Sequence, residues 1–549
     1  MDTTKKTKFI AKCLVALSTI VFLTACSQQI SPTGGKRDII APKLKTSIPS
    51  NKQINYSGKT VELMFDEYIV AENLQQKLQI TPDAGEYDVK LEATSLKLVF
   101  KKDFEKDNTY SLAFGDAIKD FSEKNPVKNL RVVFSSGAKI DSASIDGMIS
   151  DIQSGKPMLE VLVGLYKKTD TLNPEKTKPT YFTRTDSAGQ FNIENIRPET
   201  YILMAIDDKN RSMTYNIKNE RFGYIGDSII VKPNTQMSGV ALGLYYTESQ
   251  PLKTRNSTSR INYYTLNYNK GLEKIKVQFT DPKDSIPFFQ SSSSEIQFFN
   301  TVNSKDTIRV KTTVVDSSGI EMETIQKIKF KDNKGNAKEI SKDKEIFRAT
   351  MLPNYNDEID PEIIKYVITF NKPIETYDLT KIKMYSDSTK EEILTPLDFE
   401  WSNFKSVLTI NKKFVGKKEL KISIPKGTFI SVENDTLSDN KVQLKIKNEE
   451  DYGTIIGNVI SNNSDVIIEL LDNNFKVIKS GEATEFKFSF VKPGEYYLRA
   501  IEDKDKNRKW DSGNFKTKKQ PERIKFYQEL IKVRKNFILE GLEINLSTK

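Results

Sequence analysis

The sequence has 549 residues, only two cysteines and no histidine, and its formal net charge is +10 at pH 7. The absence of histidine excludes Ser-His-Asp and Cys-His nucleophile systems, His-ligated zinc and the commonest general base. Basic residues are interspersed with acidic ones and form no stripe, which argues against a nucleic-acid partner. The length predicts several domains, each with its own hydrophobic core.

The N-terminal segment predicts export and lipidation. A basic head precedes an apolar run from Phe9 to Leu23, which is too short to span a bilayer and is typical of a signal peptide. The run leads into Leu-Thr-Ala-Cys, which resembles the lipobox of bacterial lipoproteins. We therefore expect residues 1–25 to be removed and Cys26 to carry the lipid anchor, followed by a flexible spacer over 26–40. The alternative is an ordinary signal peptide with a chance cysteine.

Short strands dominate the next part of the chain. Apolar and polar residues alternate with period two between polar turns, and long amphipathic patterns are nearly absent. This arrangement predicts an immunoglobulin-like β-sandwich over residues 41–138. The strand signals are Val61–Phe65, Leu96–Phe100, Tyr110–Phe114 and Leu130–Phe134.

A different pattern covers residues 139–246. A strand around Val161–Tyr166 is followed by a T-D-x-x-G-x-F turn at Thr185–Phe191 and a second turn at Pro198–Tyr201. Aspartate and glycine are placed where the backbone needs a tight reversal. The segment is therefore expected to form a second β-sandwich of another type.

Both patterns recur later, which indicates an internal duplication of a two-domain unit. Residues 351–448 repeat the first pattern and residues 449–549 repeat the second. Between them, residues 247–350 begin with a polar Ser/Thr/Asn linker and continue as a middle β domain. The predicted fold class is all-β, with serial β-sandwich domains. A short helix is the alternative for the stretch from Pro521 to Val533, where strands are favoured.

The motifs resemble one group of bacterial proteins. The strings PTGGKRD, FDEYI, GDAIKDFSEKNPVKN and TDSAGQF…RPETY are similar to those of Bacteroidota lipoproteins, most clearly over residues 31–240. The resemblance implies a bacterial Ig-like domain followed by a carboxypeptidase-regulatory-like (prealbumin-like) sandwich, repeated once. The second copy departs from the pattern, because Asn371 replaces Asp66 and the T-D-x-x-G-x-F turn is missing before Phe486.

One loop near the C-terminus has the oxygen spacing of a calcium site. Asp503, Asp505, Asn507 and Asp511 stand at positions 1, 3, 5 and 9. Position 6, however, is Arg508 instead of glycine, and other basic residues lie within the loop. We therefore favour a turn in which the acids bond the local backbone, with calcium as the alternative and no other cofactor expected. The weaker first-copy counterparts are Asp208, Asn210, Ser212 and Asn216.

Asp116, Asp120 and Glu123 could supply the two carboxylates of a glycoside hydrolase. They follow a predicted strand in a polar loop, where solvated acids are common. We favour a loop without catalytic function.

Six short Asp-Ser or Asp-Thr motifs resemble the acceptor for general O-glycosylation of exported Bacteroidota proteins. The candidate positions are Ser142, Thr171, Ser228, Ser285, Thr307 and Thr436.

These observations predict a non-catalytic outer-membrane lipoprotein. We expect it to be a multi-domain scaffold or interaction subunit whose partners are outer-membrane proteins, such as a β-barrel assembly or export complex. The sequence leaves open which leaflet it faces. A glycan-binding or adhesive surface lipoprotein is the alternative, and an enzyme is a third hypothesis that would need a cleft with two close carboxylates.

Overall fold

The computed structural model is all-β, as the sequence predicts. Its one α-helix within the described residues is the short α2 (Leu74–Lys77), and no described helix is long or apolar enough to cross a membrane. The predicted signal peptide and Cys26 lie outside the described residues. The structure describes residues 37–247, 250–302, 304, 306–316, 319–332, 344–387 and 390–547.

The first β-sandwich forms because alternate side chains point inward. In β2, Val61, Leu63 and Phe65 are buried while their neighbours are only half-buried. These side chains pack with a ring cluster in which Phe104 lies 4.7 Å from Tyr110 and 4.9 Å from Phe134, centroid to centroid. Its sheets have the orders β1-β2-β6-β5, β4-β7-β9 and β3-β8. The strands are β1 (Leu44–Ile48), β2 (Thr60–Phe65), β3 (Ile69–Ala71), β4 (Gln79–Thr81), β5 (Tyr87–Leu91), β6 (Ser95–Phe100), β7 (Thr109–Ala113), β8 (Ile118–Asp120) and β9 (Arg131–Ser135).

The second β-sandwich contains a parallel pair, β10 with β17, in the sheet β13-β10-β17. Its other sheet has the order β12-β11-β14-β15, with β16 paired to β14. The predicted turn is built as expected, because the Asp186 carboxylate accepts bonds from the backbone of Ala188 and Gln190, and Gly189 has φ +72°. The strands are β10 (Ala143–Asp151), β11 (Leu162–Lys167), β12 (Tyr181–Arg184), β13 (Gln190–Ile196), β14 (Thr200–Ile206), β15 (Phe222–Tyr224), β16 (Ile229–Ile230) and β17 (Gln236–Leu244).

The middle unit packs the sheet β18-β19-β22-β21 on the sheet β20-β23-β24. The Ser/Thr/Asn-rich stretch that the sequence assigns to a linker includes an edge strand, Thr254–Ser259. This strand is polar because its side chains are largely exposed, so composition gave no signal for it. The elements are β18 (Thr254–Ser259), β19 (Tyr263–Tyr268), β20 (Leu272–Phe279), η1 (Pro282–Asp284), β21 (Phe288–Ser292), β22 (Glu295–Phe299), β23 (Ile308–Asp316) and β24 (Glu321–Ile328).

The fourth unit repeats the first. Its sheet β25-β27-β32-β31 matches β1-β2-β6-β5, and its pair β28-β34 matches β3-β8. Asn371 keeps the role of Asp66, because its side chain accepts a bond from the Arg348 backbone at 2.9 Å as Asp66 does from Lys43 at 2.7 Å. The elements are β25 (Ala349–Leu352), β26 (Glu358–Ile359), β27 (Ile363–Phe370), β28 (Ile374–Tyr377), η2 (Leu379–Lys381), β29 (Lys383–Ser386), β30 (Lys390–Glu391), η3 (Pro396–Asp398), β31 (Phe399–Ser402), β32 (Val407–Lys413), β33 (Glu419–Ile424), β34 (Phe429–Ser431), β35 (Asn440–Ile446) and η4 (Glu449–Asp451).

The fifth unit repeats the second, including a parallel pair between β36 and β43. Its sheets run β39-β36-β43 and β38-β37-β40-β41, with β42 paired to β40. Strands β41 and β42 occupy the stretch for which a helix was the alternative, so the strand prediction is confirmed. The strands are β36 (Gly453–Ile460), β37 (Val466–Leu471), β38 (Val477–Gly481), β39 (Glu485–Val491), β40 (Gly494–Glu502), β41 (Ile524–Phe526), β42 (Ile531–Val533) and β43 (Ile538–Asn545).

Neighbouring units contact one another along the chain. At the first junction, the Thr109 hydroxyl donates to Asp141 at 3.0 Å. Between the third and fourth units, Gln290 and Asn403 exchange two hydrogen bonds of 2.9 and 2.8 Å. Between the fourth and fifth, the Tyr452 hydroxyl donates to Glu358 at 2.7 Å.

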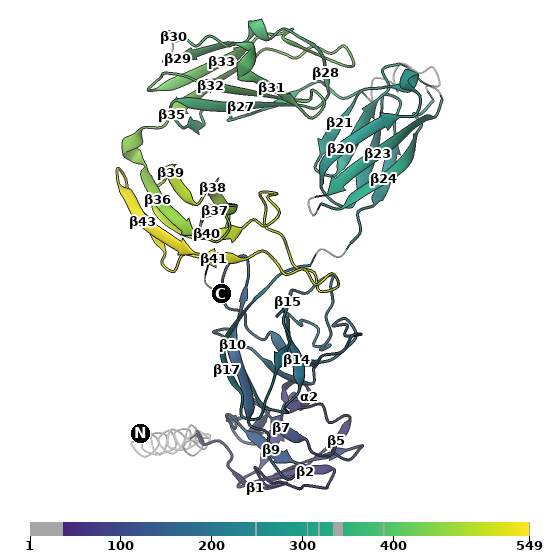
Figure 1. Cartoon of the computed structure of the whole chain (residues 1–549), viewed down its shortest axis with the longest axis vertical. Helices are drawn as coiled ribbons and strands as arrows, with labels where there is room; N and C mark the ends of the chain where they lie inside the picture. The colour runs from purple at the N-terminus through teal and green to yellow at the C-terminus, as the bar shows by residue number, and fades with distance from the viewer. Residues whose placement is uncertain are drawn as a thin grey trace, which may run out of the picture.

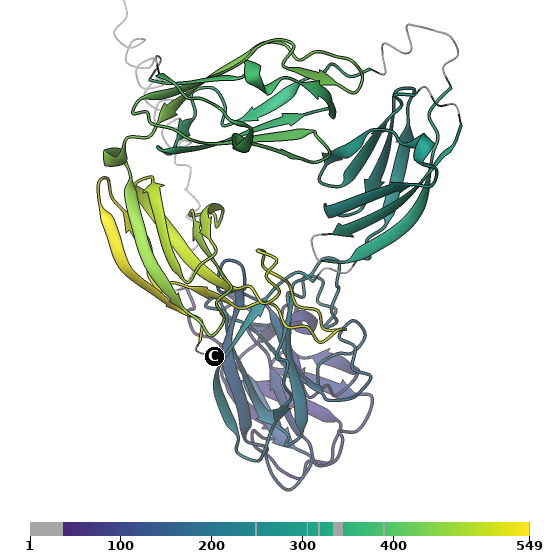
Figure 2. The ribbon, with the colours of Figure 1, turned by 45° about the horizontal axis from the view of Figure 1, so that its top comes forward.

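The chain also closes on itself. The second to fifth units follow one another around a closed path, and loops of the fifth unit reach over the second (Figures 1 and 2). This closure joins residues that lie about 300 positions apart in sequence, such as Tyr224 and Lys519. It brings the second and fifth units into direct contact.

Candidate interaction site between the second and fifth units

The closure depends on one long loop, which we call the clasp loop and define as residues 503–522, between β40 and β41. Its aromatic side chains lie on aromatic residues of the second unit. The Phe515 ring contacts Tyr224 and Phe222 edge to face, with centroids 5.1 and 5.9 Å apart. The Trp510 ring lies 6.4 Å from that of Tyr245. These contacts remove apolar surface from water on both sides.

Polar contacts fix the position of the clasp loop. The Tyr224 hydroxyl donates to the backbone carbonyl of Lys519 at 3.2 Å, and the Lys516 ammonium pairs with Glu175 at 2.8 Å. Close packing occurs at Gly513, where a Cβ atom would lie 2.2 Å from the Tyr245 hydroxyl oxygen. A larger residue at this position would force the loop away from the second unit.

The bodies of the two units meet beside the clasp loop. Arg499 in β40 is only 7% exposed and donates to the backbone carbonyl of Gln153 and to its side-chain oxygen, the latter at 3.0 Å. Its guanidinium charge is balanced by Glu469 at 2.6 Å. The Lys156 ammonium lies 4.7 Å from the Phe475 ring centroid, a cation–π contact.

Within the clasp loop, buried carboxylates organise the backbone. The Asp503 carboxylate accepts bonds from the backbone of Asn507 at 3.1 Å and of Arg508 at 2.9 Å. The Glu522 carboxylate accepts bonds from the backbone of Lys504 at 2.7 Å and of Asp511 at 3.0 Å. These are the local backbone bonds that a turn of acidic residues is expected to make.

The same acids could hold a cation. Oxygens of Asp503, Asp505 and Glu522 lie within 4.8 Å of one another. Burial and the charge of nearby acids raise the pKa of Asp505 and of Glu522. Sequence reasoning missed Glu522, because it lies outside the twelve-residue spacing of a calcium loop, and it placed Asp511 as a ligand, although Lys519 pairs with Asp511 at 2.5 Å. The preference for a metal-free turn stays a prediction.

The first-copy counterpart is arranged differently. Asp208 is buried and its carboxylate pairs with the Arg184 guanidinium at 2.7 Å. It also accepts a bond from the Ser212 backbone at 2.9 Å. Arg184 therefore already balances the charge of Asp208.

The acids of the first unit that could supply a carboxylate pair each have a partner within the chain. Asp120 is fully buried, where the sequence predicted a solvated acid, and its oxygens accept bonds from the backbone of Glu123, Lys124 and Asn125. Burial alone would raise the pKa of Asp120, but these bonds outweigh it and lower the pKa to about 2. Asp116 instead pairs with Lys77 at 2.7 Å. Asp120 is the carboxylate that holds this loop together.

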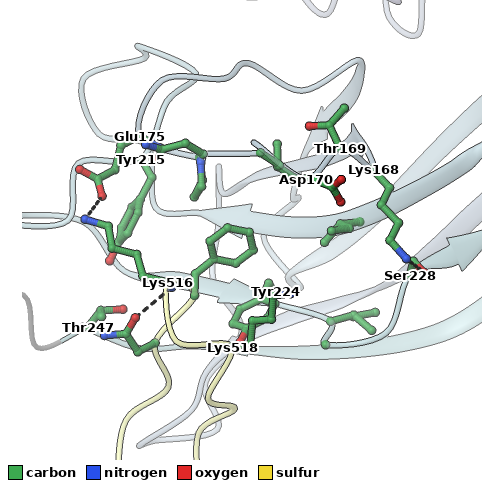
Figure 3. A pocket seen from close by; sticks show the side chains of 18 of the residues that line it. Lys168, Thr169, Asp170, Glu175, Tyr215, Tyr224, Ser228, Thr247, Lys516 and Lys518 are labelled. Atoms are coloured by element: carbon green, nitrogen blue, oxygen red, sulfur yellow. Dashed lines mark hydrogen bonds and ion pairs between the residues drawn. The ribbon is translucent and has the colours of Figure 1, made fainter.

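A cavity of about 630 Å³ lies between the clasp loop and the second unit. Figure 3 shows Tyr215, Tyr224 and Lys168 around it, with Lys516 and Lys518 contributed by the clasp loop. Burial raises the pKa of Tyr215 to about 12, so its hydroxyl keeps its proton at neutral pH.

The candidate glycosylation positions are spread over the surface. Ser228 is half-buried, lines the cavity and accepts a bond from Lys168 at 3.3 Å. The other candidates are exposed: Ser142, Thr171, Ser285, Thr307 and Thr436.

Comparison with known proteins finds a similarity for the first unit. Residues 38–136 match the model of the bacterial Ig-like domain family. The first unit is similar to bacterial Ig-like domains. None of the curated proteins compared with the chain matches it.

Solved structures share only general features with the chain. The S-layer protein rSbsC is 9% identical, with a TM-score of 0.16, over 84% of this chain and 65% of that protein, so the chain spans less than two thirds of its length. Dimeric latent PorU from Porphyromonas gingivalis is 11% identical, with a TM-score of 0.22, and the match covers 56% of this chain and 36% of that protein. The major pilin subunit BcpA of Bacillus cereus is 12% identical, with a TM-score of 0.12, and the match covers 74% of this chain and 98% of that protein. At these scores the similarities carry no inference about this chain.

Proposed function

We propose that the protein is a non-catalytic, lipid-anchored scaffold of the outer membrane. In this proposal it is an interaction subunit of a β-barrel assembly or export complex. The observation that carries the proposal is the closure of the second unit on the fifth. Tandem domains are expected to move relative to one another, whereas a chain tied at two distant points holds its surfaces in a fixed arrangement.

The lipid anchor gives the scaffold its location. The sequence around Cys26 supports an acylated N-terminus, which would keep the protein in the plane where membrane barrels lie. Confinement to that plane raises the effective concentration of partners, so interfaces of modest affinity suffice. The resemblance to Bacteroidota lipoproteins supports carboxypeptidase-regulatory-like domains as the second and fifth units, which would place two related docking surfaces on one frame.

The chemistry of the described residues also supports a role in binding. The Asp120 carboxylate accepts bonds from backbone donors and from the Asn125 amide, and Asp116 is neutralised by Lys77. The clasp acids likewise bond their own loop. Glu123, the third acid considered for catalysis, pairs with Arg37 at 2.9 Å.

Affinity purification tests the proposed function. Tagged protein extracted from membranes in mild detergent should bring down a membrane β-barrel, identified by mass spectrometry. The matched control is Cys26→Ala, which should leave the membrane fraction and lose the barrel while keeping the same fold. If wild type yields no enriched barrel but binds a glycan array, the adhesive alternative replaces the scaffold.

A further inference from the structure

The cavity under the clasp loop is lined from both sides of the closure. Ile202 and Tyr224 come from the second unit, and Phe515 comes from the clasp loop. Its volume of about 630 Å³ lies within the range of sites that bind small molecules. A ligand in this space would therefore touch both units at once.

Two buried hydroxyl groups line the cavity without well-formed hydrogen bonds. Tyr215 is 5% exposed and Thr247 is 8% exposed, and both line the cavity. The two hydroxyls lie beside each other, because Thr247 acts on the Tyr215 hydroxyl, but neither forms a hydrogen bond of good geometry within the part of the chain that the structure describes. Because buried polar groups without well-formed hydrogen bonds are costly, these two hydroxyls favour a polar atom at this end of the cavity.

Lysines at the rim favour negative charge. Among the described residues, the hydrogen-bond partner of the Lys168 ammonium is a neutral hydroxyl, that of Ser228, at 3.3 Å. Lys518 also lines the cavity, and neither lysine forms an ion pair among the described residues, whereas Lys516 is already paired with Glu175. Two acids, Asp170 and Glu175, lie in the same lining as the three lysines, and because Glu175 is paired with Lys516, an excess of positive charge remains.

We propose that this cavity binds an anionic amphiphile, a molecule with an apolar chain and a carboxylate or phosphate head group. The chain lies against Phe515, Tyr224 and Ile202, and the head group reaches Lys168 and Lys518. Polar atoms of the ligand, or water molecules bound to the ligand, form hydrogen bonds with the hydroxyl groups of Tyr215 and Thr247. Because the ligand contacts both the clasp loop and the second unit, its binding stabilises the closed chain.

Calorimetric titration of the full mature chain with dodecanoate, kept below its micelle concentration, tests the site. Saturable heat is expected, together with a change in the emission of Trp510, one of two tryptophans in the chain. Dodecyl phosphate should bind similarly, whereas neutral dodecanol should bind about tenfold more weakly. No saturable heat at millimolar dodecanoate would overturn the proposal, and equal affinity for dodecanol would overturn the anionic head group.

Variants locate the binding. The double variant Lys168→Gln/Lys518→Gln should weaken dodecanoate binding about tenfold and leave dodecanol binding unchanged. Lys487→Gln, an exposed lysine of β39, is the matched control. Ile202→Trp fills the cavity and should abolish the binding of both dodecanoate and dodecanol. Circular dichroism checks that each variant is folded. Undiminished binding by the double variant and by Ile202→Trp would place the ligand elsewhere and refute the assignment.

A covalent lock tests the coupling to closure. Gly226 and Gln520 face each other, since a Cβ on Gly226 would lie 3.5 Å from Gln520 Cγ. The pair Gly226→Cys/Gln520→Cys, once oxidised, should hold the clasp loop closed. Dodecanoate should then slow trypsin cleavage of the clasp loop in wild type and have no effect on the locked variant. Equal cleavage of wild type with and without dodecanoate would refute the coupling.

Discussion

Truncation of Phe515 should open the clasp loop. Phe515→Ala removes a half-buried ring whose neighbours are Phe222 and Tyr224. Half of the transfer free energy of a phenylalanine side chain is about 1 kcal/mol. Two edge-to-face contacts add about 1 kcal/mol more. Closure should therefore weaken by about 2 kcal/mol, a change of roughly thirtyfold in the ratio of closed to open chains.

Limited proteolysis measures this change, because the clasp loop contains many lysines and cleavage of a transiently open segment follows its open population. Phe515→Ala should be cut by trypsin within the clasp loop roughly thirtyfold faster than wild type. Phe537→Ala, which truncates a phenylalanine that is 51% exposed, is the matched control and should leave the rate unchanged. Equal cleavage of Phe515→Ala and wild type would refute the claim that this ring holds the closure.

Other expectations concern the acids and the surface. Calcium titration should give no saturable heat at millimolar concentration, because backbone donors and Lys519 already occupy the clasp acids; a micromolar transition would contradict this. Because the pKa of Asp120 is lowered to about 2, its stabilising effect is complete above the unfolded value near 4 and disappears as pH falls toward 2. Hydrogen exchange of the loop at residues 120–126, corrected for intrinsic rates, should accelerate over that range, and Asp120→Asn should exchange fast already at pH 7; unchanged exchange in the variant would disprove this role. Intact mass of protein from its native host should show glycans on at least two of the six candidate positions, and a mass of polypeptide plus lipid alone would exclude them.

The sequence predicted the fold where burial alternates along a strand. Val61–Phe65 carries that alternation, and so does Tyr366–Phe370 within residues 351–448, where the sequence predicted a repeat of the first pattern. The replacement of Asp66 by Asn371 made the second copy look looser than it is. An amide oxygen accepts the same backbone bond as a carboxylate oxygen, so the local structure survives the change. The exposed edge strand Thr254–Ser259 gave no such signal.

The site was harder to predict, because it depends on contacts between distant parts of the chain. The loop at Asp503–Asp511 was found from its oxygen spacing, which is local. The role of Glu522 could not be predicted, because it depends on the end of the clasp loop folding back onto its start. The contacts of Phe515 could not be predicted either, because they depend on how the fifth unit lies against the second. A solvated loop was predicted around Asp120, whose burial arises from tertiary packing that spacing does not report.

The central claim is that this chain is a scaffold subunit of a membrane complex. It is tested most directly by size exclusion with light scattering on the tagged protein, purified from membranes in several mild detergents. The account predicts a complex of fixed stoichiometry that contains a membrane β-barrel and dissociates in harsher detergent. Recovery of the protein as a monomer in every mild detergent would contradict it.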